Sequence, residues 1–358
     1  MNVLISAPSL DPRTNVSGIS SVVQNVIIAA KPDCLYHHFQ VGKSDKENRI
    51  VSLVKLTFSV IRYPYSLLSN KIDIAHQNIP FDRKGITREF LFVLIATCLR
   101  IPVLAHIHGG ELLLSKSPDR LTWLLAKILL HFSSSIIVLG QIEKGSIIKQ
   151  YGIQGEKIIV LPNAVICIPE HKNVVCEKTP LNLLFIGRFD ERKGLNEIAI
   201  ALNSLTDQLI PYRFSLCGDG DYQSIFVSAL QSEARANVNF LGVVSGDSKT
   251  KVYLESDVLC LPSYFEGLPM SLLEAMSFGL VPITTGVGSI PEVVISGVNG
   301  LIIPIKNSEA IVNSIISLHK NRQLLLSMSN AAKKTIDQKY NMKSYADKLF
   351  ALYSTSIR

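Results

Sequence analysis

The sequence predicts an α/β protein built from two doubly wound parallel sheets. Apolar runs of four to six residues, the length of buried strands, alternate along the chain with longer segments of helical period. This alternation stops near residue 165 and starts again near residue 181. The composition agrees, because 47% of the residues are hydrophobic and only 7% are aromatic, a balance typical of buried parallel sheets rich in Ile, Leu and Val.

The first half contains six expected strands. They span 3–7, 35–41, 72–76, 103–107, 136–139 and 158–161. The clearest helical patterns between them span 19–30, 88–99 and 120–132. Repeated strand–helix–strand units give parallel sheets joined by right-handed crossovers. We therefore assign residues 1–165 to an amino-terminal domain.

The second half repeats this pattern with six further strands. They are expected at 182–186, 213–217, 238–241, 258–261, 281–284 and 300–303. Residues 166–180 contain prolines and charges without a regular period, so we interpret them as a linker. Residues 181–340 then form a second domain. Residues 341–358 form a carboxy-terminal helix that could pack on either domain, including back on the first.

The segment YFEGLPMSLLEAMSFG, residues 264–279, carries two acids around the start of a helix. Gly267 permits a tight turn, and Pro269 suits the first helical turn. The amino terminus of such a helix can hold a phosphate, because its amides are unpaired and partially positive. Glu266 and Glu274 could then bind hydroxyl groups on either side of a pyrophosphate. The alternative is an acid near the helix start and an ordinary surface glutamate.

The segment LLFIGRFDERKG, residues 183–194, places two cations after a strand. Gly187 lets the backbone approach a ligand closely, and Arg188 and Lys193 could hold its phosphates. Solvated loop charges are the alternative. Two such strand-to-helix turns in one domain favour a nucleotide-diphosphate ligand.

Four motifs together resemble a known family. GRFDERKG (187–194), CGDGD (217–221), EGLPMSLLEAMSFG (266–279) and PEVVISGVNG (291–300) resemble the second domain of a retaining glycosyltransferase of the GT-B fold, family 4, the glycosyl transferases group 1. The resemblance covers roughly residues 180–305. It implies two facing Rossmann-like domains with a cleft between them. It also implies an enzyme that uses a nucleotide-diphosphate sugar as donor, with neither a cofactor nor a metal ion.

The resemblance also assigns roles to residues. Arg188 and Lys193 match positions that bind the donor diphosphate, and Glu266 matches a glutamate near the donor sugar. His108, in HIHGGE (106–111), matches a histidine beside that sugar. These four are the candidate catalytic residues. A His near a strand end could otherwise serve only to satisfy local hydrogen bonds.

The remaining matches concern the donor. Glu274 matches the glutamate that holds the ribose, and the backbone amides of Leu272 and Leu273 match groups beside the nucleotide and phosphate. The candidate donor-binding residues are Gly18, Gly187, Gly218, Gly220, Leu272, Leu273 and Glu274. The sequence departs from the family where Ser17-Gly18 replaces two glycines, where Gly140 replaces a serine, and where Ala164 replaces a glycine.

The family mechanism implies that the acceptor attacks from the side of the leaving group. A donor phosphate oxygen would accept its proton, so no side chain is assigned as general base. Glu266 as a covalent nucleophile is an alternative. Two other functions stay open, a GT-B nucleotide-sugar epimerase and a catalytically silent subunit that binds nucleotide sugars.

The net charge of +7 is concentrated in the first half. Residues 1–175 contain 19 Lys and Arg against 12 Asp and Glu, whereas the remainder contains 17 of each. We expect this domain to contact an anionic membrane and a glycan or lipid-linked acceptor of bacterial surface polysaccharide synthesis. No motif for nucleic acid is present. The start MNVLISAP reads as a strand, and no apolar run is long enough to span a bilayer, so we expect a cytoplasmic protein, or one held at the inner face of the cytoplasmic membrane.

Overall fold

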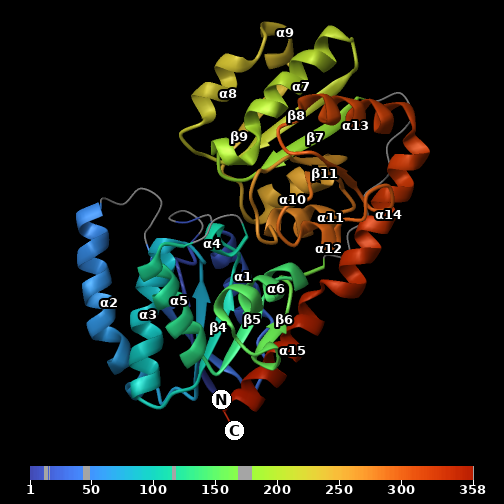
Figure 1. Ribbon diagram of the computed structural model, residues 1–358. Helices are drawn as coiled ribbons and strands as arrows, with labels where there is room; N and C mark the ends of the chain where they lie inside the picture. The colour runs from blue at the N-terminus through green and yellow to red at the C-terminus, as the bar shows by residue number, and fades with distance from the viewer. Residues whose placement is uncertain (12–14, 16, 43–48, 115–117, 168–179, 358) are drawn as a thin grey trace. The chain divides into compact units, whose positions relative to one another are not determined.

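The computed structural model in Figure 1 describes residues 1–11, 15, 17–42, 49–114, 118–167 and 180–357. The chain forms two compact units. The first comprises Met1–Ile166 and Asn341–Arg358, and the second comprises Cys167–Tyr340. Of the expected linker, residues 168–179 lie outside the described part of the chain.

The first unit contains a parallel sheet in the order β2-β1-β3-β4-β5-β6. Its strands are β1 (Asn2–Ala7), β2 (Leu35–Gln40), β3 (Ile74–Ile79), β4 (Val103–Ile107), β5 (Ser135–Val138) and β6 (Ile158–Val160). Strand β1 pairs with β2 on one side and with β3 on the other, so the direction in which strands are added to the sheet reverses between β1 and β3. In doubly wound sheets, ligands bind at the carboxyl ends of the strands at such a switch point.

Helices cover both faces of this sheet. They are α1 (Gly18–Ile28), α2 (Arg49–Ser69), α3 (Arg83–Cys98), α4 (Glu111–Leu114), α5 (Arg120–Phe132), α6 (Gln141–Tyr151) and α15 (Met342–Ser356), with a short 3₁₀ turn at Gly155–Lys157. The side chains of Ser17, Asp82 and Asp119 cap α1, α3 and α5 by accepting bonds from backbone amides. None of the described helices combines the length and apolar character that a bilayer-spanning helix needs.

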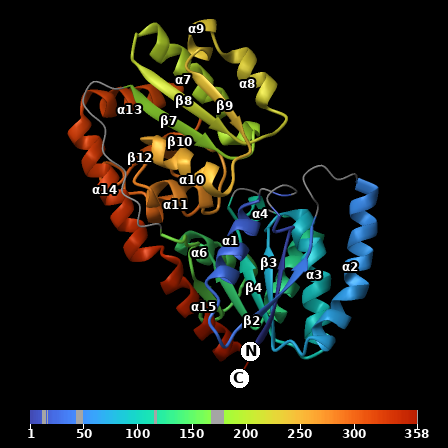
Figure 2. The same ribbon diagram turned by 180° about the vertical axis from the view of Figure 1, so that it is seen from behind.

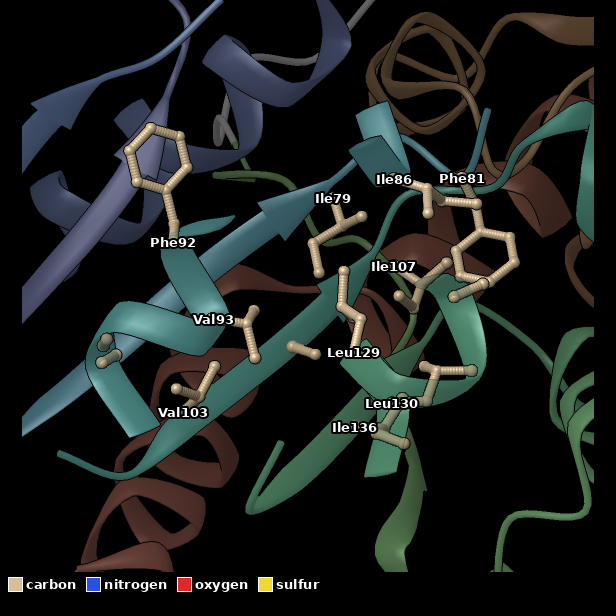
Figure 3. Packing of buried hydrophobic residues seen from close by; sticks show 14 of the residues in the cluster. Ile79, Phe81, Ile86, Phe92, Val93, Val103, Ile107, Leu129, Leu130 and Ile136 are labelled. Atoms are coloured by element: carbon tan, nitrogen blue, oxygen red, sulfur yellow. The ribbon is translucent and has the colours of Figure 1, made fainter. Parts of the chain in front are cut away.

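The main core of the first unit lies between the sheet and the layer formed by α2, α3 and α5 (Figures 1 and 2). Figure 3 shows Phe92 and Val93 of α3 and Leu129 and Leu130 of α5 packed in this core with Ile107 of β4. All five side chains are fully or almost fully buried. The apolar side chains of alternate strand positions therefore anchor this helical layer.

One strand differs from the expectation. The apolar run indicated a strand at 72–76, but β3 spans Ile74–Ile79 and continues through His76, Gln77 and Asn78. These three polar side chains are buried, and each is hydrogen-bonded, to Tyr353, Tyr63 and Ser6 respectively. An apolar pattern misses a strand of this kind, because tertiary hydrogen bonds offset the cost of burying its polar groups.

The second unit has a parallel sheet in the order β12-β11-β10-β7-β8-β9. Its strands are β7 (Leu181–Ile186), β8 (Tyr212–Cys217), β9 (Val238–Gly242), β10 (Val258–Leu261), β11 (Val281–Thr285) and β12 (Leu301–Ile303). The switch point lies between β7 and β10, which pair directly. Cys217 and Cys260 are buried free thiols in two of these strands.

The helices of the second unit follow its strands. They are η2 (Glu191–Lys193), α7 (Leu195–Asp207), α8 (Gln223–Ala229), α9 (Ser232–Arg235), α10 (Gly246–Glu255), α11 (Met270–Ser277), α12 (Ile290–Val293), α13 (Ser308–Lys320) and α14 (Arg322–Lys339). Helix α11 is followed by Gly279 with φ of +79°, a conformation that favours glycine at a helix end.

The last helix, α15, packs within the first unit. The Met342 amide donates to the Val165 carbonyl at 2.9 Å, and the Asn341 side chain caps the helix. Tyr345, Leu349 and Tyr353 are buried. The chain thus returns to the first unit after completing the second.

Candidate active site

Lys193 and Glu266 meet at the switch point of the second sheet. Lys193 lies in the connection that follows β7, and Glu266 lies in the connection that follows β10. The Lys193 Nζ lies 2.6 Å from Glu266 Oε1, and the Ser263 hydroxyl donates to the same oxygen at 2.8 Å. Glu266 is 9% exposed. Within the described residues both of these contacts use Oε1, so Oε2 can accept a bond from a ligand.

Two glycines hold these loops together. A Cβ at Gly194 would lie 2.3 Å from the Pro262 carbonyl oxygen, and a Cβ at Gly288 would lie 2.2 Å from the Glu266 carbonyl oxygen. Both glycines have positive φ, +73° and +57°. Because only glycine tolerates such approach and such dihedrals, the two positions set where the Glu266 loop lies.

Glu274 is held by two residues of α10. The Lys249 Nζ lies 2.7 Å from Oε1, and the Tyr253 hydroxyl donates to Oε2 at 2.8 Å. Burial, together with the negative charge of Glu274, raises the pKa of Tyr253 well above its usual value, so the hydroxyl stays protonated and can donate. A carboxylate offers about four acceptor positions, so Glu274 can still accept bonds from a diol.

The start of α11 is arranged as the sequence predicts, with one refinement. The amides of Leu272 and Leu273 both donate to the Pro269 carbonyl, at 3.2 and 3.4 Å, and both side chains are fully buried. The two preceding amides, of Met270 and Ser271, lie before the first i to i−4 bond and lack an acceptor within the helix. Those two amides are therefore better placed than the predicted pair to face a phosphate.

The predicted glycines of β7 and β8 lie where their two loops cross. A Cβ at Gly218 would lie 1.9 Å from the Gly187 carbonyl oxygen, and one at Gly220 would lie 2.3 Å from the Phe189 carbonyl oxygen. This crossing gives both glycines a packing reason besides any contact with a nucleotide. Arg188 follows Gly187 at the carboxyl end of β7 and is exposed.

Several polar residues of the site were missed by sequence reasoning. The Tyr264 hydroxyl donates to Glu197 Oε2 at 2.5 Å, and the Lys306 ammonium lies 5.1 Å from the centre of the Tyr264 ring. Lys249 and Tyr253 were also missed, although their i, i+4 spacing places them on one face of a helix. That spacing was the signal available. Nothing local indicated that this face meets Glu274.

His108 lies at the carboxyl end of β4 in the first unit. The Asn78 amide nitrogen donates to the Ser6 carbonyl at 2.8 Å, so Asn78 Oδ1 faces His108 Nε2, which donates to it at 2.7 Å. Desolvation lowers the pKa of His108, which keeps the ring neutral at physiological pH. The His108 Nδ1 is therefore a hydrogen-bond acceptor.

Two further histidines, His106 and His76, form a chain of contacts from His108 towards the interior of the first unit. The ring centres of His106 and His108 lie 4.0 Å apart, the His76 Nε2 lies 3.2 Å from His106 Nδ1, and the His76 Nδ1 lies 2.6 Å from the Tyr353 hydroxyl. Burial lowers the pKa of His76 to about 3 and that of His106 well below its usual value. The array therefore links the loop after β4 to helix α15 through uncharged rings.

Gly18 is the first residue of α1, directly after the Ser17 cap. A Cβ there would meet nothing within 4 Å. The described part of the protein thus gives no packing reason for glycine at this helix start. Among the described residues, no group of three or more His, Cys, Asp or Glu side chains is arranged to hold a metal ion.

Comparison with known proteins identifies related chains. Residues 169–335 match the family described as glycosyl transferases group 1. An uncharacterized 41.2 kDa protein in the cps region of Klebsiella pneumoniae is 26% identical over 74% of this chain and 73% of that protein. The UDP-Gal:alpha-D-GlcNAc-diphosphoundecaprenol alpha-1,3-galactosyltransferase of Escherichia coli is 24% identical over 85% of this chain and 81% of the enzyme.

Among solved structures, Anabaena Alr3699/HepE in complex with UDP has a TM-score of 0.76 at 16% identity, covering 99% of this chain and 100% of that one. The same protein has also been solved with UDP-glucose. This likeness shows the fold, which is of the GT-B type with two Rossmann-like units, as the sequence predicts.

Proposed function

We propose that this chain, whose residues 169–335 match the glycosyl transferases group 1 family, transfers a sugar from a nucleotide-diphosphate sugar to a glycan or lipid-linked acceptor. The proposed transfer retains the anomeric configuration and uses no bound metal ion. Its place is the synthesis of a bacterial surface polysaccharide, such as capsule, O-antigen or exopolysaccharide.

The observation that carries this proposal is the junction of Lys193 and Glu266 at the switch point. A cation and an acid held together after β7 and β10 can bind the two parts of a nucleotide-sugar donor, its diphosphate and its sugar. The Lys193 ammonium suits the diphosphate, and the free oxygen of Glu266 suits a sugar hydroxyl. Glu274, within helix α11 that follows the Glu266 loop, suits the ribose.

Breaking the bond between sugar and phosphate leaves negative charge on the departing diphosphate. Lys193, Arg188 and the first amides of α11 would stabilise that charge. Preorganised groups of this kind are typically worth about 3–4 kcal/mol each. The acceptor hydroxyl would pass its proton to a donor phosphate oxygen, so no protein base is required. From the first unit, His108 would accept a bond from a sugar hydroxyl at Nδ1.

The nucleotide-sugar donor is supported by the UDP and UDP-glucose complexes of the related fold. A lipid-linked acceptor is supported by the Escherichia coli relative, which is named as a galactosyltransferase acting on a diphosphoundecaprenol substrate. The basic first unit fits contact with an anionic membrane surface from the cytoplasmic side. No observation favours the epimerase or the silent subunit.

A thermal-shift screen of the whole protein against UDP-, GDP-, ADP- and CMP-sugars tests the donor class. A ligand at 100 times its Kd should add about 2.7 kcal/mol to the free energy of unfolding. With the donor that stabilises most, NMR of the released or transferred sugar should show the anomeric configuration of the donor. Activity should survive an excess of chelator.

Three results would contradict the proposal at different points. A protein that no nucleotide sugar stabilises lacks the proposed donor site. An inverted product contradicts retention. Loss of activity in chelator, restored by Mg²⁺ or Mn²⁺, contradicts the metal-free reaction while leaving the donor site intact.

A further inference from the structure

Helix α2 (Arg49–Ser69) exposes a continuous apolar stripe. The spacings within the stripe are four, three, four and three residues, so its members lie within about a quarter of the helix circumference. Each side chain is between 59% and 71% exposed. The stripe consists of Val54, Phe58, Ile61, Tyr65 and Leu68.

The opposite face of the same helix already fills the core. Tyr63 and Leu67 are buried at 0% and 1% exposure, and Leu56 and Val60 pack against the same cluster. Helix α2 therefore has two apolar faces, and folding of the first unit uses only one. A surface helix normally turns a polar face to water. An exposed apolar stripe of this length marks an interaction surface.

The charge beside this stripe has a single sign. Lys55 and Arg62 are exposed and lie one heptad apart, on one flank of the stripe. Lys71, just after the helix, is exposed too, and residues 49–72 contain no Asp or Glu. The next acid, Asp73, is exposed and accepts a bond from the Asn2 amide at 2.7 Å. An apolar stripe bordered only by cations is typical of a helix that lies in the headgroup region of an anionic bilayer.

The neighbouring helices α3 and α5 also expose apolar side chains and cations. Helix α2 packs beside α3, and α3 beside α5 (Figures 1 and 2). On these two helices four leucines are between 38% and 61% exposed: Leu91, Leu94, Leu121 and Leu124. The one acid within α3 and α5 is Glu89, which is fully buried and paired with Arg88 at 2.7 Å. The exposed side of this layer thus offers leucines and cations, with acids only at the Asp82 and Asp119 caps.

We propose that the outer face of α2 binds the surface of an anionic phospholipid bilayer. Val54, Phe58, Ile61, Tyr65 and Leu68 insert at the boundary between headgroups and acyl chains, and Lys55 and Arg62 contact lipid phosphates. The cationic flank favours this occupant over a second copy of the chain, whose α2 would bring like charges together. This inference deepens the membrane contact of the proposed function and rests on that part of it alone.

Vesicle flotation of the full-length protein tests this surface. The probes are vesicles of phosphatidylcholine mixed with phosphatidylglycerol, and vesicles of phosphatidylcholine alone. The wild-type protein should float with the anionic vesicles and far less with the neutral ones, and raised salt should weaken binding. Phe58→Gln/Ile61→Gln should lower binding by roughly tenfold or more, because two large apolar side chains no longer leave water.

Matched controls distinguish the effect of changing the α2 stripe from the effect of making the same substitutions elsewhere on the surface. Ile200→Gln/Ile225→Gln makes the same change at two isoleucines that are 48% and 49% exposed on α7 and α8, and it should float like the wild type. Lys55→Gln/Arg62→Gln should lose roughly tenfold on anionic vesicles, while its weak binding to neutral vesicles should not change. Thermal melts check that each variant folds.

Several outcomes would overturn the inference. The wild type could fail to float with anionic vesicles, or Phe58→Gln/Ile61→Gln could float as well as the wild type. A dimer in sedimentation that this variant abolishes would mean that a second copy covers the stripe. Stabilisation by nucleotide sugars is measured on the same samples. If it persists while flotation fails, the membrane surface is wrong and the donor site stands.

Discussion

At the residue scale, the pair of Lys193 and Glu266 explains why an acid stands beside the proposed phosphate site. The side chains of Lys193 and Glu266 are 25% and 10% exposed, so neither charge is fully hydrated. A partly buried carboxylate without a partner carries a desolvation penalty, and a partner cation offsets much of that penalty. The acid in turn keeps the ammonium in one position before the ligand arrives. The pair is thus a preformed half of the proposed donor site.

Replacement of Lys193 by alanine should lower kcat by at least tenfold. The reason is the loss of a fixed cation beside the departing diphosphate, an effect of about 3 kcal/mol for comparable groups. The variant also leaves the Glu266 carboxylate without its cation, which costs roughly 1–3 kcal/mol of stability. Steady-state kinetics with the best donor and thermal melts measure the two effects separately.

Two further variants test whether the result for Lys193→Ala comes from the lost cation, from the unpaired Glu266 charge or from the removal of any lysine. Lys193→Ala/Glu266→Gln removes the unpaired charge, so its melting temperature should recover while its kcat stays low. Lys251→Ala changes a lysine that is 74% exposed and paired with Glu255 on the surface of α10, and it should turn over normally. Turnover of Lys193→Ala at the wild-type rate would show that this lysine does not act on the leaving group.

At the element scale, the site depends on the close approach of loops that follow different strands. The loop after β11 lies against the loop after β10, where the Ser289 amide donates to the Gly267 carbonyl at 2.9 Å. Gly288 permits this contact, because any side chain there would collide with the backbone of Glu266. The position of the Glu266 carboxylate is therefore set partly by a glycine outside its own loop.

Gly288→Ala should destabilise the second unit by roughly 3 kcal/mol and reduce turnover as well. Its Cβ would lie 2.2 Å from the Glu266 carbonyl oxygen, and its φ of +57° disfavours alanine. Urea unfolding and steady-state kinetics measure both effects. The matched control is Gly145→Ala inside α6, where a Cβ meets nothing within 4 Å. That change should leave activity intact and stabilise by about 0.5–1 kcal/mol. Equal stability of the two variants would contradict the steric account.

At the scale of the whole molecule, the two units differ in charge. The residues of the first unit contain 21 Lys and Arg against 12 Asp and Glu, a net charge of +9, and those of the second contain 15 against 17, a net charge of −2. The first unit also buries His76 and His106 as neutral rings. Acid should therefore affect the first unit more, because it must protonate these buried rings inside a unit that already carries a net positive charge.

The stability of the first unit should fall as the pH drops from about 6.5 towards 3. The pKa of His76 is about 3 when folded and near its ordinary 6.5 when unfolded, so in this window the unfolded chain binds the proton. Stability conferred by a lowered histidine pKa is complete above about 6.5 and declines below it, by up to about 1.4 kcal/mol per pH unit for each such group.

Fluorescence of the single tryptophan measures this effect selectively, because Trp123 lies in α5 of the first unit. Urea unfolding between pH 7 and pH 5 gives the free energy of unfolding as a function of pH. The slope of that free energy against pH should be smaller in His76→Gln than in the wild type by up to about 1.4 kcal/mol per pH unit, which corresponds to one proton. His131→Gln, at an exposed position of the same helix as the tryptophan, should keep the wild-type slope. An unchanged slope in His76→Gln would mean that His76 is not buried uncharged.

Most elements, and the proposed type of ligand, followed from local pattern. Apolar runs predicted the strands of both sheets to within a few residues, because a buried strand must be apolar over its own length. The glycines, cations and acids after β7 and β10 predicted phosphate and diol binding, because a strand-to-helix turn exposes the same backbone groups in any sheet. The family resemblance added the roles of individual residues.

The amino-acid sequence alone thus determined the two α/β units and supplied the candidate site residues. Tertiary structure alone decided which of them meet: Lys193 with Glu266 across 73 positions, and Glu274 with Lys249 across 25. It also decided that the face of α2 containing Tyr63 is buried while the face containing Phe58 is exposed. Both faces are apolar, so periodicity cannot choose between them. The choice belongs to the packing partners, which are distant in the chain and invisible to local pattern.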